Sequence, residues 1–140
     1  MSDLRSYISQ IKKINELKTI KSPVSTKYEI AGITAKVDGS DAVLFEKIKE
    51  SDFKLIANLV GTRKRFAIAV GGTENTIHEK VISAIKKAKK PKIISSGKFM
   101  ENKSKNLLSM PIVTHFEKES GPFITSSVAY AKNPETGKQN

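Results

Sequence analysis

The chain has 140 residues and a mass of 15.4 kDa, which fits one ordinary domain or a small domain with part of a second. No apolar run approaches the roughly 20 residues of a membrane-spanning helix, so we expect no membrane span. Cysteine is absent, which excludes disulfides, thiolate metal sites and a cysteine nucleophile, and suits a cytoplasmic location.

Positive charge is in excess, with 25 lysines and arginines against 14 acids. Much of it lies in residues 86–105, which hold eight lysines and one acid, Glu101. Such density attracts phosphate-bearing partners, so a polyanion- or nucleic-acid-binding module is one open interpretation, and a solvated lysine-rich surface is the simpler one. Arginine occurs only at Arg5, Arg63 and Arg65, which argues against sequence-specific nucleic-acid recognition.

The first half of the chain predicts alternating helices and strands. A helix capped by Ser2 carries one apolar stripe: Leu4, Tyr7, Ile8, Ile11 and Ile14. Residues 17–20 read as a short strand. Thr26 and Glu29 have the spacing of a capping box, which predicts a helix over Ile30 to Val37. Strands are expected over residues 42–45 and 53–59.

The second half begins with a short helix from Thr62 to about Val70, followed by a glycine pair. Another capping box predicts a helix that starts at Thr76 and stops at Pro91. Its apolar stripe comprises Ile77, Val81, Ile82, Ile85 and Ala88. Further on, strands are expected at 93–94 and 123–132, with a polar basic linker over 95–106, an apolar element over 106–113 and a turn at 133–137.

The strand over 123–132 has no return strand, because the sequence stops at Asn140 soon after the turn. An unpaired strand is an exposed edge, which proteins normally avoid. We therefore expect the chain to be cut short or completed by another polypeptide. No phosphate-loop, dinucleotide, serine-hydrolase or zinc-protease motif is present. Gly71-Gly72 is more typical of a helix break than of an anion site, and His78 and His115 are interpreted first as surface and loop residues.

Six stretches, in order along the chain, resemble motifs of the UbiD family of decarboxylases: DLRSYI (3–8), YEIAGI (28–33), AVLFE (42–46), NLVGTRKR (58–65), LSMPI with GPFIT (108–125) and NPETGKQN (133–140). The resemblance spans the chain but only the N-terminal part of the family. It implies a mixed α/β fold, with a three-layer-like N-terminal domain over 1–105, including the basic linker. The first strands of a truncated split β-barrel, of the flavin reductase type, would follow over 106–140.

The same resemblance implies non-oxidative decarboxylation of an α,β-unsaturated or aromatic acid, such as polyprenyl-4-hydroxybenzoate or anhydromevalonate phosphate. The implied cofactor is prenylated FMN, supplied by a UbiX-like flavin prenyltransferase and held with Mn²⁺ or Mg²⁺ and K⁺. Thr125 matches a threonine near the flavin, and Asn140 matches a metal-ligating asparagine whose amide oxygen suits a hard cation.

The family's catalytic arginine and both catalytic glutamates lie beyond Asn140, so the resemblance implies no catalytic residue in this chain. We expect it to be inactive alone and to need the remaining C-terminal part, from the same gene or a separate subunit, within a homo-oligomer. A non-catalytic scaffold domain is the remaining alternative.

Overall fold

The computed structural model describes residues 3–89, 92–97, 100, 101, 103 and 105–139. A three-stranded sheet of order β1-β2-β3 forms its centre: β1 (Leu17–Ile20), β2 (Ala42–Phe45) and β3 (Leu55–Ala57). β1 pairs in parallel with β2, and β2 pairs antiparallel with β3. The helix α2 (Glu29–Lys36) lies in the crossover between the two parallel strands, as a parallel pair requires.

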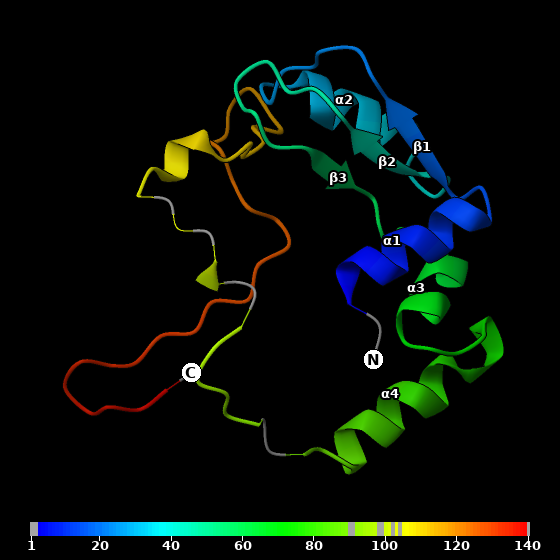
Figure 1. Ribbon diagram of the computed structural model, residues 1–140, viewed down its shortest axis with the longest axis vertical. Helices are drawn as coiled ribbons and strands as arrows, with labels where there is room; N and C mark the ends of the chain where they lie inside the picture. The colour runs from blue at the N-terminus through cyan, green and yellow to red at the C-terminus, as the bar shows by residue number, and fades with distance from the viewer. Residues whose placement is uncertain (1–2, 90–91, 98–99, 102, 104, 140) are drawn as a thin grey trace.

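β2 is buried on both faces, because its alternating side chains enter two separate apolar clusters. Val43 and Phe45 pack with Ile30 of α2. Ala42 points the other way, toward Tyr7 and Ile11. These last two belong to α1 (Leu4–Lys13), which lies beside α3 (Arg63–Ala69) below the sheet (Figure 1). The expected mixed α/β fold is confirmed, with helices on both sides of the central sheet.

Several boundaries expected from the sequence need correction at the helix starts. The cap of α1 is Asp3, whose carboxylate accepts the Ser6 N–H at 2.8 Å; Ser2 lies outside the described residues. α2 starts at Glu29 without the predicted capping box: its N-cap residue is Tyr28, and the Glu29 carboxylate accepts the Ser25 N–H at 2.6 Å rather than that of Thr26. Thr62 does cap α3, accepting the Arg65 N–H at 3.2 Å.

The region after α3 also departs from expectation. A 3-10 turn, η1 (Glu74–Thr76), precedes α4 (Ile77–Lys86), and the capping box is formed by Thr73 with Thr76 rather than by Thr76 with Glu79. Thr76 is nevertheless the N-cap residue of α4, as predicted, although it makes no side-chain capping bond there. The helix ends at Lys86, before Pro91, which lies outside the described residues.

The expected strands in the C-terminal third are absent from the described residues. Residues 93–94 are irregular and exposed, and only a 3-10 turn, η3 (Leu107–Ser109), forms within 106–113. Residues 123–132 hold no strand, although Lys132 and Gln139 make one antiparallel bridge around the predicted 133–137 turn. The strand prediction over 123–132 is wrong for this chain by itself, because an alternating pattern forms a strand only when a neighbouring strand binds its backbone.

Candidate functional site

Residues 110–123 connect the C-terminal segment to the N-terminal fold. Val113 is buried in the cluster of α2 and β2. Its neighbour Thr114 donates its N–H to the Thr26 carbonyl oxygen at 3.1 Å and accepts the Tyr28 N–H at 3.1 Å. Ser51 Oγ donates to the Ser109 carbonyl oxygen at 2.6 Å. Backbone and side-chain contacts thus hold this segment on the N-terminal fold.

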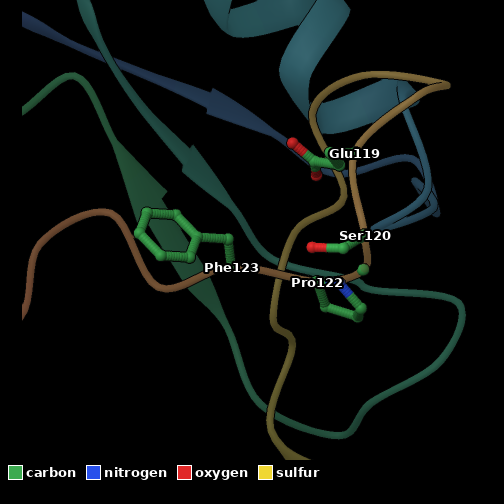
Figure 2. A pocket seen from close by; sticks show the side chains of 5 residues that line it. Glu119, Ser120, Pro122 and Phe123 are labelled. Carbon is green, nitrogen blue, oxygen red and sulfur yellow. The ribbon is translucent and has the colours of Figure 1, made fainter.

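The loop over 115–121 leaves a shallow hollow of about 380 Å³ lined by Glu119, Ser120, Gly121, Pro122 and Phe123. The Phe123 N–H donates to the Val113 carbonyl oxygen at 3.0 Å, which closes the loop at its base. Figure 2 shows Phe123 directed away from Glu119 and Ser120. Glu119 already accepts the His115 N–H at 2.6 Å, and its carboxylate lies 3.9 Å from His115 Nδ1. The carboxylate therefore orders the loop.

The two predicted site residues lie further along the chain. Thr125 is exposed, in a turn that follows Ile124. Asn140 lies outside the described residues, so its distance from Thr125 is not described. Asn133 holds the intervening turn by accepting the N–H groups of Glu135 and Thr136 at 2.9 and 2.8 Å. Among the described residues, no group of three or more histidines and acids is placed to hold a metal.

Among the described residues, one charged side chain is buried, and it belongs to the NLVGTRKR stretch. Arg65 is fully buried. Its Nη1 lies 2.9 Å from Glu16 Oε2 and donates to the Ser40 carbonyl oxygen, and its Nη2 donates to the Asn58 carbonyl oxygen at 3.2 Å. Nε donates to the Leu59 carbonyl oxygen at 3.2 Å. One guanidinium thus joins four residues on three separate loops around the sheet: Glu16, Ser40 and the Asn58–Leu59 turn.

Asn58 and Gly61 complete the same turn. Asn58 adopts a left-handed conformation with φ of 57°, which asparagine tolerates better than most residues. Its Nδ2 donates to the carbonyl oxygens of Val37 at 3.1 Å and Asp41 at 2.9 Å. Gly61 lies so close that an added Cβ would overlap the Asn58 side-chain amide. Glycine is therefore required at position 61, because the Asn58 side chain leaves no room for a Cβ there.

Tyr7 connects α1 to this turn, with its Oη 2.8 Å from the Leu59 carbonyl oxygen and 3.1 Å from that of Arg65. Burial raises the pKa of the Tyr7 hydroxyl, so it stays protonated as a donor. Hydrogen bonds from Lys64 first, and then from Arg65, lower the pKa of Glu16 below its ordinary value of 4.5. None of the described residues has a buried side-chain polar atom without a partner. All buried polar atoms of this cluster therefore have hydrogen-bond partners, and its role is structural. We call its four residues, Tyr7, Glu16, Asn58 and Arg65, the clamp. This cluster was not predicted from the sequence, because the arginines were considered there only as residues that recognise nucleic acid.

The clamp predicts a loss of stability in acid. Because the pKa of Glu16 is lower in the folded chain than in the unfolded chain, its contribution is complete above about pH 4.5 and declines as the pH falls through the lowered pKa. The pKa values of Asp41 and Glu50 are also lowered, mainly by hydrogen bonds from Lys18 and Ser25. We expect the free energy of unfolding in urea to fall below pH 4.5, and less steeply in Glu16→Gln. An equal slope in that variant would contradict the assignment to Glu16.

Two models of known protein families match adjacent parts of the chain. The family model for the 3-octaprenyl-4-hydroxybenzoate carboxy-lyase N-terminal domain (UbiD_N) matches residues 8–85, and that for the Rift-related domain (UbiD) matches residues 86–140. The chain belongs to the UbiD family. The expected resemblance is confirmed.

Relatives of this UbiD-family chain are about three times longer. It is 26% identical over 137 residues to the anhydromevalonate phosphate decarboxylase of Methanothermobacter thermautotrophicus, covering 98% of this chain and 32% of that protein. The anhydromevalonate phosphate decarboxylase of Methanosarcina mazei is 29% identical to this chain over 130 residues, and the match covers 91% of this chain and 30% of that protein. The chain therefore spans about a third of the curated relatives it matches.

A solved structure supports the same assignment. The UbiD-class enzyme HmfF from Pelotomaculum thermopropionicum, in complex with FMN, superposes with a TM-score of 0.87 at 26% identity, covering 98% of this chain and 32% of that one. An evolved dimeric form of HmfF, in complex with prFMN, superposes with a TM-score of 0.83 at 26% identity, and the match covers 100% of this chain and 34% of that one. Along the described chain, no helix has the length and apolar character needed to cross a membrane.

Proposed function

We propose that this chain is the N-terminal part of a prenylated-FMN-dependent decarboxylase that acts on an α,β-unsaturated or aromatic carboxylic acid. The consecutive matches to the two UbiD family models carry the proposal. The decarboxylase names of two relatives and the flavin complexes of HmfF support it. Anhydromevalonate phosphate is the first substrate to test, because both of those relatives are named for it, and polyprenyl-4-hydroxybenzoate is the second.

The chain alone is proposed to be inactive. The described residues fit only part of a flavin and metal site: Thr125 presents an exposed hydroxyl, and no histidine–acid group accompanies it. The remaining ligands and the proton-transferring residues would come from the C-terminal part of the complete protein. With that part in place, Asn140 would ligate Mn²⁺ or Mg²⁺ through its amide oxygen, and Thr125 would contact the prenylated FMN, which supplies the decarboxylation chemistry when bound. A K⁺ ion would lie nearby.

The exposed segment after the hollow supports completion by another polypeptide. Phe123, Val128 and Tyr130 are 65%, 78% and 77% exposed, and Ile124, Val128 and Tyr130 alternate as on a strand. Large apolar side chains at period two are typical of one face of a paired strand. We propose that residues 106–140 enter the split barrel when the C-terminal part adds its strands, and that residues 1–105 form the separate N-terminal domain. The family models instead meet at residues 85 and 86.

The test is to produce the chain together with the C-terminal part, in cells that also make a UbiX-like flavin prenyltransferase. We expect the assembled, homo-oligomeric protein to retain prenylated FMN, seen by its absorbance, and to release CO₂ from the substrate. The 140-residue chain alone should do neither. Flavin retention or CO₂ release by the chain alone would contradict the proposed division, as would an assembled protein without flavin. The predicted cytoplasmic location stays a prediction.

Two substitutions test the proposed ligands in the assembled protein. Asn140→Ala is expected to lower Mn²⁺ affinity at least about tenfold, since it removes an oxygen ligand. Thr125→Val should weaken flavin retention while leaving the fold unchanged. Ser126→Ala, beside Thr125 in the same turn, is the matched control and should behave as wild type. Wild-type metal content by elemental analysis in Asn140→Ala would contradict its role.

A further inference from the structure

The helix α4 presents an apolar face that the described chain does not cover. Ile77 is buried at its start, but Val81, Ile82 and Ile85 are 39%, 50% and 73% exposed. These residues follow one another at spacings of four, one and three, so they share one broad face of the helix. Figure 1 shows α4 at the edge of the molecule, away from the three-stranded sheet.

This apolar face needs a partner for energetic reasons. An isolated helix of ten residues, the length of α4, is marginal in water, because most helical stability comes from packing an apolar face. Burial of a single isoleucine or valine side chain contributes about 1.5–3 kcal/mol. Contacts with η1 cover only the first turn, where Ile77 lies. The remaining face is therefore a strong candidate for an interface.

Charge decides what kind of partner fits. Exposed lysines gather at the C-terminal end of the apolar face: Lys86 in the last turn of α4, and Lys87 and Lys89 just after it. The whole chain carries a formal charge of +11. A second copy of α4 on this face would bring like charges together in an interface, which costs free energy. An apolar surface rimmed by aspartate and glutamate is complementary to both features.

Chain length indicates where that surface comes from. The relatives continue for about twice the length of this chain beyond the region matched, and α4 lies where the match to the second family model begins, at residue 86. We propose that the Val81–Ile82–Ile85 face of α4 is the docking surface for the C-terminal part of the complete UbiD-family protein, through an apolar patch with an acidic rim. This inference rests on the proposed function, because it takes its partner from there.

The experiment compares two glutamate substitutions on opposite sides of α4. Ile85→Glu places a charge in the apolar face, and Ser83→Glu places the same charge on the exposed polar side. Each chain is purified, checked for helix content by circular dichroism, and titrated with the separately produced C-terminal part by calorimetry. We expect Ile85→Glu to weaken association about 10- to 100-fold and Ser83→Glu less than twofold. Hydrogen exchange of residues 77–86 should slow in the complexes of the wild-type and Ser83→Glu chains, and not when the Ile85→Glu chain is mixed with the C-terminal part.

Several outcomes would overturn the inference. Equal affinity of Ile85→Glu and wild type would show that α4 is not the docking surface. A wild-type dimer in sedimentation analysis that Ile85→Glu disrupts would assign the face to a second copy, and binding to phosphatidylglycerol vesicles that Ile85→Glu abolishes would assign it to a lipid surface. The proposed function fails separately: a complex that depends on Ile85 but retains no flavin supports the docking surface and contradicts the decarboxylase.

Discussion

Replacement of Arg65 by methionine is expected to lower the free energy of unfolding by about 3–5 kcal/mol, as breaking a buried ion pair does. The side chain is fully buried and binds Glu16 at 2.9 Å. Methionine fills much of the same volume but removes the guanidinium donor from the carbonyl oxygens of Ser40, Asn58 and Leu59. Leu59 keeps the Tyr7 hydroxyl and Asn58 keeps the Gly61 N–H, so the loss is largest at Ser40 and at the Glu16 carboxylate. Urea unfolding followed by circular dichroism measures the loss.

Lys64→Met is the matched control, because Lys64 binds the same carboxylate at 2.7 Å from an exposed position. An exposed ion pair contributes at most about 1 kcal/mol, so this variant should lose little stability. Arg65→Lys tests geometry at constant charge, and we expect it to be destabilised nearly as much as Arg65→Met, because an ammonium group cannot reach all four acceptor residues at once. Equal stability of Arg65→Met and Lys64→Met would show that the buried network is not a clamp.

Gly61→Ala is expected to cost about 1–3 kcal/mol, although it adds one methyl group. The new Cβ would overlap the Asn58 side chain, which must then move away from its two hydrogen-bond acceptors, the carbonyl oxygens of Val37 and Asp41. Buried polar groups that lose their partners account for most of the cost. The loss should appear as a lower urea midpoint with an unchanged slope.

The control for Gly61→Ala is Gly32→Ala in α2. No atom lies within 4 Å of the position where its Cβ would be, and the residue is exposed within a helix. Alanine in a helix interior is about 0.5–1 kcal/mol more favourable than glycine. The two substitutions are chemically identical and should therefore change stability in opposite directions. A shift of the same sign in both would contradict the close-approach explanation.

The elements that the sequence predicted correctly are those with local causes. α1 follows from its apolar stripe, β1 from its alternating pattern, β2 from a short apolar run, and the start of α3 from Thr62, whose hydroxyl caps the first turn. The turn around Asn133 was likewise predicted from its residue types. Six motifs in family order were enough to identify the UbiD family, which the family models confirm.

The sequence by itself thus determined the order of the main elements and the family, because helix periodicity, caps and turns act between residues a few positions apart. Only the tertiary structure decided that Arg65 is buried beside Glu16, which is 49 residues away, and that the Thr26 carbonyl oxygen accepts the Thr114 N–H. It also decided that the apolar face of α4 is exposed and that residues 123–132 form no strand in the described chain. These features depend on contacts between residues far apart in the sequence, and the spacing of neighbouring residues does not predict such contacts.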